Sequence, residues 1–213
     1  MATARRKHNA AERRRQLADA AIELLGQDGI HGVSHPKVDA RAGVACGTTS
    51  FYFRTRKALL LAIATRMAER DAADLSLMAE IADHESPHFA GIAGLAQIVM
   101  YAATEPWLTR AKARYEFALL ASRDPELAAV LGESTDRLHA LAHAVVTQWH
   151  PAGATPDPAV VTDQVAATLA LINGVMMTFT TGRPAVDSAE QLERLIRGVI
   201  AGVGGGSGAI VTE

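Results

Sequence analysis

Residues 32–60 read GVSHPKVDARAGVACGTTSFYFRTRKALL, and this stretch decides the fold. Ser34 is a good N-cap for a short helix, and Pro36 stands in the first turn, where its missing amide proton costs little. This helix is expected to run to Gly43, where the chain turns. A second short helix is predicted over residues 45–51. Two short helices joined by a tight glycine turn form a helix-turn-helix, whose second helix can enter the major groove of DNA.

Apolar residues recur at helical spacing on both sides of this stretch. Leu17, Ala21 and Leu24 mark one face of a helix expected over residues 9–26. A long helix is expected from Thr55 to about Ile81, and further helices over 89–104, 106–122, 125–149, 161–179 and 192–203. Alanine is abundant, and alternating runs of Val, Ile and Thr are hard to find. The sequence therefore predicts an all-α fold.

Charge is divided unequally along the chain. Residues 1–66 hold 12 Lys and Arg against 5 Asp and Glu, a net charge of +7, whereas the remainder holds 9 against 18, a net charge of −9. A basic segment attached to an acidic one suggests that the first meets polyanions. We expect a helix-turn-helix domain over residues 1–54, a larger helical domain over 55–205 and a flexible tail over 206–213.

A single cysteine, Cys46, leaves no internal disulfide framework and favours a reducing compartment. No run approaches the roughly 18 apolar residues of a membrane span, and the basic start of the chain lacks a following apolar stretch. The sequence therefore predicts a cytoplasmic protein that does not engage a membrane.

Residues 9–62 resemble the N-terminal DNA-binding domain of the tetracycline-repressor (TetR) family of bacterial transcriptional regulators. The matching positions are Gly26, Gly29, Gly32, Ser34, Val38, Ala42, Gly43, Val44, Gly47, Thr48, Tyr52, Phe53 and Leu59. The chain departs from the family pattern at Asp39, where alanine is frequent, at Ala45 and Cys46 in place of Ser and Lys, at Ser50 in place of Tyr and at Arg56 in place of Lys. The resemblance implies a homodimer whose C-terminal helices dimerise and enclose a pocket for a small effector.

The resemblance and the side-chain chemistry together predict a set of DNA contacts. Most protein contacts to DNA go to phosphate and sugar, and threonine can also meet base edges or a thymine methyl. The predicted contact residues are Ser34, Cys46, Thr48, Thr49, Tyr52, Arg54, Arg56 and Lys57. The basic residues 5–7 have two interpretations, an arm that reaches a minor groove or a solubilising terminus.

Large apolar side chains in the acidic part suit two roles. The two apolar helices near the C-terminus suit a four-helix dimer interface, or they pack in the monomer's own core. The predicted interface residues are Val165, Leu169, Ile172, Leu192, Ile196 and Val199. Other large side chains could line an effector cavity or fill the bundle core. The predicted effector residues are Met100, Tyr101, Trp107, Tyr115, Phe117, Met176 and Phe179.

Other classes of function receive less support. We find no GxSxG, Walker A, paired-cysteine or dinucleotide motif, so we expect neither catalysis nor a cofactor. His139 and His143 have i, i+4 spacing, but with no third ligand we expect no metal site. The alternative to a DNA-binding regulator is an adaptor that keeps the helix-turn-helix without specific DNA binding. Ala45 and Ser50 favour the adaptor, and the +7 charge opposes it.

The resulting hypothesis is a homodimer that binds a pseudo-palindromic operator. Its two recognition helices would lie about one DNA turn apart, roughly 34 to 36 Å, or a multiple of it. The resemblance makes repression the expected outcome, with release by a small molecule that binds two conformers unequally. The long helix from Thr55 would connect the two domains.

Overall fold

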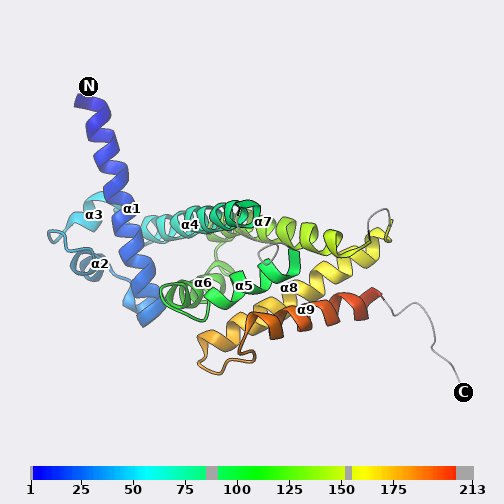
Figure 1. The fold of residues 1–213 in the computed structure, drawn as a ribbon. Helices are drawn as coiled ribbons and strands as arrows, with labels where there is room; N and C mark the ends of the chain where they lie inside the picture. The colour runs from blue at the N-terminus through cyan, green and yellow to red at the C-terminus, as the bar shows by residue number, and fades with distance from the viewer. Residues whose placement is uncertain (1, 85–90, 152–154, 205–213) are drawn as a thin grey trace, which may run out of the picture. The chain divides into compact units, whose positions relative to one another are not determined.

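The computed structural model describes the backbone of residues 2–84, 91–151 and 155–204, and the side chains of residues 9–74, 91–151 and 155–203. Every regular element in these ranges is a helix, which confirms the predicted all-α class (Figure 1). The described residues form two compact units. The first comprises Met1–Asp74 and Thr109–Ser134, and the second comprises Leu75–Leu108 and Thr135–Glu213.

The first unit contains the predicted helix-turn-helix. Its elements are α1 (Ala2–Asp28), the short 3-10 helix η1 (Ile30–Gly32), α2 (His35–Arg41), α3 (Thr48–Tyr52), the first part of α4 (Arg56–His84), most of α6 (Trp107–Ala121) and the start of α7 (Pro125–Trp149). α1 begins at Ala2 and not at the predicted residue 9, so the backbone of the basic segment 5–7 is helical. The side chains of that segment lie outside the described residues.

An apolar core joins α1, α4 and α6 in the first unit. Leu17 and Ala21, which mark the predicted apolar face of α1, are fully buried, together with Ile63 of α4 and Phe117 of α6. α1 approaches α6 so closely that a Cβ at Gly26 would collide with the backbone of α6. The apolar periodicity of α1 therefore predicted correctly which face of this helix is buried.

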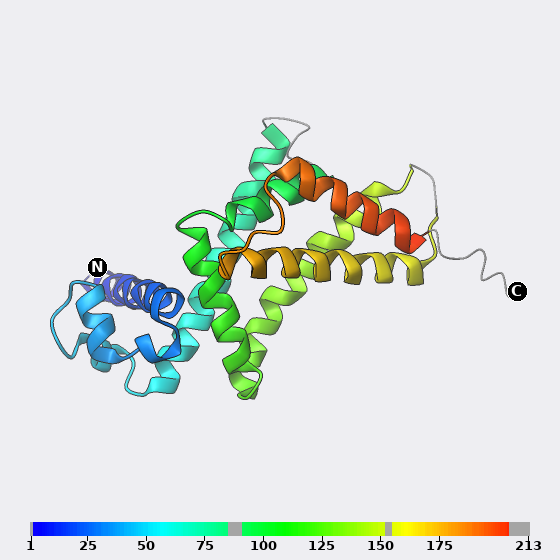
Figure 2. The same ribbon diagram turned by 90° about the horizontal axis from the view of Figure 1, so that it is seen from below.

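The second unit contains the remainder of α4, α5 (Gly91–Tyr101), the first two residues of α6, the remainder of α7, α8 (Pro158–Thr180) and α9 (Ala189–Gly204). α9 packs against both α5 and α8, and Figure 2 shows α8 in gold and α9 in red side by side, as in Figure 1. The helix α8 begins where Asp157 caps it by accepting a hydrogen bond of 2.9 Å from the amide of Ala159. Leu192, Ile196 and Ile200 of α9 are fully buried.

Within the described residues, α8 has the length and mean hydropathy of a membrane span. A single helix of this kind is weak evidence for a membrane span, because helices of soluble proteins can have the same length and hydropathy. The apolar character of α8 therefore does not indicate a membrane protein.

The predicted domain boundary at residues 54 and 55 lies just before the start of α4 at Arg56. The compact units divide the chain differently, because α6 and the first part of α4 pack with the helix-turn-helix. The division into a DNA-binding and an effector domain stays a prediction, and the predicted tail over 206–213 lies outside the described residues.

Candidate nucleic-acid interface

The α2–α3 pair has the geometry of a helix-turn-helix. α2 starts after Ser34 with proline in its first turn, as predicted. Gly43 and Gly47 have φ angles of 65° and 89°, a left-handed backbone that residues with a Cβ rarely adopt. Because Gly47 is the N-cap, α3 begins at Thr48, three residues after the predicted start. Residues 45–47 belong to the turn.

Asp39 of α2 is buried and binds the start of α3. Its Oδ2 accepts a hydrogen bond of 2.7 Å from the amide of Gly47, and its Oδ1 accepts bonds of 2.7 and 2.5 Å from the amide and hydroxyl of Thr49. Burial alone raises the pKa of Asp39, but these hydrogen bonds and the nearby His35 outweigh burial and hold the pKa below its ordinary value. The carboxylate therefore stays charged at neutral pH.

Thr49 lies in the interior and not on the DNA-facing surface. Its side chain is 0% exposed, and its hydroxyl donates to Asp39. This corrects the predicted contact set, in which Thr49 meets base edges. The sequence pattern did not reveal the burial because the partner carboxylate belongs to another helix.

The exposed surface of α3 is formed by Ser50 and Phe51, with Thr48 and Tyr52 half-buried beside them. Phe51 is 77% exposed, and its ring meets that of Tyr52 edge-on at 5.2 Å between centroids. The guanidinium of Arg14 lies 5.5 Å from the centroid of the Tyr52 ring. Phe51 was missed in the sequence prediction, although an aromatic residue next to Tyr52 on the recognition helix was a usable signal.

Three further predicted contacts remain accessible. Cys46 and Arg54 are exposed, and Ser34 is half-buried at the N-cap position of α2, where its side chain makes no capping hydrogen bond. Within the described part of the chain, Arg54 has neither a hydrogen bond nor an ion pair that would compete with a phosphate.

Arg56 and Lys57 are already bound by other parts of the first unit. The Arg56 guanidinium donates to the carbonyl oxygen of Val33 at 2.7 Å and to one in η1 at 2.9 Å. The Nζ atom of Lys57 lies 3.3 Å from Asp124 and 2.7 Å from Glu126, and hydrogen bonds to these carboxylates raise the pKa of Lys57. A DNA phosphate would have to compete with these partners.

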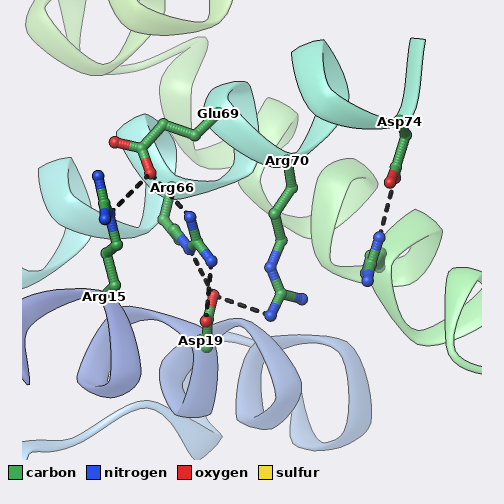
Figure 3. Close-up of polar contacts among 7 residues, drawn as sticks. Arg15, Asp19, Arg66, Glu69, Arg70 and Asp74 are labelled. Atoms are coloured by element: carbon green, nitrogen blue, oxygen red, sulfur yellow. Dashed lines mark hydrogen bonds and ion pairs between the residues drawn. The ribbon is translucent and has the colours of Figure 1, made fainter. Parts of the chain in front are cut away.

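Ion pairs connect α1 to α4 along one side of the first unit (Figure 3). Asp19 accepts from Arg66 at 2.7 Å and pairs with Arg70 at 3.0 Å. Glu69 pairs with Arg66 at 2.8 Å and with Arg15 at 3.8 Å. The hydrogen bonds to Asp19 and Glu69 raise the pKa of Arg66 despite its partial burial. The two helices are therefore tied by charge as well as by the apolar core.

Further along α4, two acidic residues pair with arginines of α6. Asp71 pairs with Arg114 at 2.5 Å, and Asp74 pairs with Arg110 at 2.9 Å, a contact drawn in Figure 3. We call the α4 residues Arg66, Arg70, Asp71 and Asp74 the charge ladder. The charge ladder binds α1 through its arginines and α6 through its aspartates.

An open groove of about 510 Å³ adjoins the α1 side of the charge ladder. It is lined by Glu12, Arg15, Gln16, Asp19, Ala20, Glu23, Arg41, Ala42 and Arg66. Small-molecule sites are mostly apolar with a few polar groups. This highly charged groove therefore does not fit the expected effector pocket.

The predicted effector residues are divided between the two units. Phe117 is fully buried in the core of the first unit with α1 and α4, which agrees with the alternative that it fills the bundle core, and its contact with an effector stays a prediction. Tyr115 is half-buried in the same unit, and burial raises its pKa. The second unit holds Met100, Tyr101, Trp107, Met176 and Phe179. The rings of Tyr101 and Trp107 lie tilted at 5.5 Å, and Phe179 is buried.

Four of the predicted interface residues are buried inside the single chain, namely Val165, Ile172, Leu192 and Ile196. Leu169 and Val199 are half-buried. These four residues therefore agree with the alternative interpretation of the sequence, in which the two apolar helices pack in the monomer's own core. The exposed positions of these helices include small and apolar residues, namely Ala166, Ala170, Gly174 and Met177 on α8 and Leu195, Gly198 and Gly202 on α9. Polar and charged residues are exposed beside them, among them Asn173 on α8 and Arg194 and Arg197 on α9.

No group of three His, Cys, Asp or Glu side chains is placed to hold a metal ion within the described ranges. His139 and His143 are exposed on α7, and the Nδ1 atom of His143 lies 3.4 Å from the hydroxyl of Thr147.

Two protein families match the chain. The family described as bacterial regulatory proteins, tetR family, matches residues 17–63, which contain the helix-turn-helix. The family described as tetracyclin repressor-like, C-terminal domain, matches residues 87–202, more than half of the chain. The HTH-type transcriptional regulator BetI of Escherichia coli (strain K12 / DH10B) is 44% identical over 48 residues, which are 22% of this chain and 25% of BetI. The match thus spans a quarter of that relative.

Solved structures are similar over most of the chain. A TetR-family member from Streptomyces coelicolor A3 is 27% identical with a TM-score of 0.64, covering 88% of this chain and 98% of that one. The multidrug binding protein EbrR, complexed with imidazole, is 26% identical with a TM-score of 0.58, covering 88% and 94%. A transcriptional regulator from Rhodococcus sp. Rha1, 22% identical with a TM-score of 0.69, covers 89% and 95% and supports the fold alone. The chain belongs to the TetR family of bacterial regulatory proteins.

Proposed function

We propose that the protein is a sequence-specific DNA-binding transcriptional regulator, a repressor released from a palindromic operator by a small-molecule effector. The observation that carries this proposal is the helix-turn-helix itself, which exposes α3 from a segment with a net charge of +7. The adaptor alternative is not favoured, because family matches cover both the helix-turn-helix and the C-terminal part. We also propose that the protein acts in the cytoplasm and is not an enzyme, and its membership of a family of transcriptional regulators supports both proposals.

The proposed DNA contacts differ from the sequence prediction in three ways. Thr49 leaves the set because it is buried, and Arg56 and Lys57 become secondary because the protein already binds them. Phe51 joins the set because it is the most exposed large side chain of α3. The remaining contacts are Ser34, Cys46, Thr48, Tyr52 and Arg54. Phe51 has no hydroxyl for a phosphate, so its contact would be apolar, for example with a thymine methyl.

Selection of bound fragments from a random DNA pool, followed by salt titration of the recovered sequence, tests the function. We expect an inverted repeat and a steep fall of affinity with salt. Phe51→Ala and Tyr52→Ala should lower the affinity for the recovered sequence more than for a scrambled duplex. Failure of the folded protein to enrich any sequence would reject the proposal and favour the adaptor.

We further propose a homodimer formed by the exposed small-residue faces of α8 and α9. A Cβ built at Gly174, Gly198 or Gly202 meets nothing within 4 Å, so these positions leave room for a partner helix. Met177 and Leu195, each 42% exposed, would supply apolar contacts. Leu195→Glu should convert the dimer into a monomer at micromolar concentration in analytical ultracentrifugation. A wild-type monomer would reject this interface.

The effector is proposed to bind the second unit. Thr168 of α8 is 0% exposed, and its hydroxyl has no hydrogen-bond partner in the described part of the chain, so it could anchor a ligand. Because solved EbrR complexes contain proflavin and ethidium, these dyes are suitable first probes. Binding that is unchanged by Thr168→Val would remove this residue from the site.

The charge ladder is a proposed route from the effector to the DNA-binding helices. A movement of α6 would act on Asp71 and Asp74 of α4, and α4 also binds α1 through Arg66 and Arg70. The reciprocal swap Asp71→Arg with Arg114→Asp keeps the pair and reverses its charges. We expect each single variant to weaken effector-induced DNA release and the double variant to restore it, as measured by fluorescence anisotropy.

A further inference from the structure

The recognition helix cannot hold its own position. α3 has five residues, and its N-cap, Gly47, provides no side-chain hydrogen bond. A helix this short is unstable alone, because nucleation costs more than one turn of hydrogen bonds returns. Its orientation must therefore be set by contacts from outside α3.

Asp39 supplies the missing cap from the preceding helix. Its carboxylate accepts from the amides of Gly47 and Thr49, both at 2.7 Å, which are orphan donors at the start of α3. The negative charge also lies at the positive end of the helix dipole. A third hydrogen bond, from the Thr49 hydroxyl at 2.5 Å, fixes which side of α3 faces the interior.

We propose that Asp39 is a positioning residue for DNA recognition, setting the rotation of α3 so that Thr49 faces the core and Phe51 faces the DNA. This rests on the proposed function, in which α3 reads the operator. An alanine, which is frequent at this position in the TetR family, has no acceptor for these three hydrogen bonds. This chain therefore fixes its recognition helix through an ionic cap from α2.

The first test compares Asp39→Asn and Asp39→Ala with the wild type on two duplexes, the selected operator and a scrambled duplex of equal length. Asp28→Asn is the matched control, because it removes one negative charge from an exposed site on α1. We expect both Asp39 variants to lose at least about tenfold in operator affinity, the loss of one to two charged hydrogen bonds. Affinity for the scrambled duplex should change less than about twofold, since phosphate contacts remain. Equal losses on both duplexes would overturn the proposal.

A second variant separates positioning from simple stabilisation. Asp39→Ala with Thr49→Val removes the acceptor and the orphaned hydroxyl together, which restores part of the stability lost in Asp39→Ala. Positioning predicts that the melting temperature recovers while operator affinity stays low. Recovery of both together would overturn the proposal and leave Asp39 as an ordinary packing residue.

A third readout needs no DNA and separates this inference from the proposed function. Amide hydrogen exchange at Gly47 and Thr49 should be at least about tenfold faster in Asp39→Asn than in Asp28→Asn, with core amides of α1 unchanged. Unchanged exchange would overturn the proposal even if the protein binds an operator. Faster exchange in a protein that selects no DNA sequence would reject the regulator function but retain Asp39 as the cap of α3.

Discussion

The start of α3 and the helix α9 are held in place by different forces. Three hydrogen bonds to the buried carboxylate of Asp39 hold α3, whereas Leu192, Ile196 and Ile200 hold α9 by apolar burial. A five-residue helix buries little apolar area, but the 16 residues of α9 bury a complete stripe. The position of α3, the helix proposed to read DNA, therefore depends on a buried charge. The position of α9, which is proposed to dimerise, depends on the burial of apolar side chains.

Ile196→Ala gives the largest expected effect and tests the apolar side of this comparison. The buried side chain leaves a cavity, so the free energy of unfolding should fall by about 2–5 kcal/mol. Urea denaturation should give the same loss at low and at high salt, because no charge is involved. Leu195→Ala, at a 42% exposed neighbour, is the control and should cost far less. A loss that shrinks in high salt would contradict an apolar origin.

The pH dependence of stability tests the ionic side. The pKa of Asp39 in the folded protein lies below the unfolded value of about 3.9, so its stabilisation is fully present above that value and is lost as pH falls through the folded pKa. Wild type and Asp39→Asn should therefore differ by about 1.5–3 kcal/mol at pH 7 and converge at acid pH. Urea denaturation between pH 7 and pH 3 measures this. A difference that stays constant over that range would show that the charge of Asp39 is not the cause.

Asp19→Asn should have an intermediate effect. It weakens two ion pairs with α4 whose side chains are about a quarter exposed, and we expect a loss of about 1–2 kcal/mol at low salt. High salt should reduce the loss, in contrast to Ile196→Ala. Glu12→Gln, an exposed position on the same helix, is the charge control. A salt-independent loss would indicate that the contact between α1 and α4 depends on packing alone.

Lys57→Ala should have the smallest effect. Its ion pairs are exposed, and such pairs contribute little to stability, so the melting temperature should not change measurably. Arg56→Ala, which loses two hydrogen bonds to backbone carbonyls, should lower the melting temperature. Equal reductions of the melting temperature in both variants would show that the exposed ion pairs of Lys57 contribute as much to stability as the two hydrogen bonds of Arg56.

Local signals in the sequence located most of the helices. Ser34 and Pro36 marked the start of α2, and the leucines of α1 marked its buried face. The error at α3 has a local cause, because Gly47 adopts a left-handed backbone and ends the turn three residues later than predicted. The resemblance to the TetR family, which rested on residues 9–62, is confirmed by family matches in both parts of the chain.

The candidate site was harder to predict than the fold. Thr49 was predicted to contact DNA because threonine can meet base edges or a thymine methyl, but its side chain is buried and its hydroxyl donates a hydrogen bond to Asp39. Phe117 was predicted either to line an effector cavity or to fill the bundle core, and it lies in the apolar core with residues of α1 and α4. In both cases the deciding neighbour lies on another helix, and residue type alone does not show it.

The sequence by itself determined the all-α class and the helix-turn-helix, because these follow from local periodicity, glycine positions and capping residues, and the resemblance of residues 9–62 indicated the family. Only the tertiary structure decided which polar and apolar side chains face inward. Four apolar residues predicted for a dimer interface, among them Ile172 and Leu192, are buried inside the single chain, and the exposed positions of α8 and α9 include small residues such as Gly174 and Gly198. Helical periodicity shows that one face of a helix is apolar. It does not show which element covers that face, because the covering element can come from a distant part of the sequence.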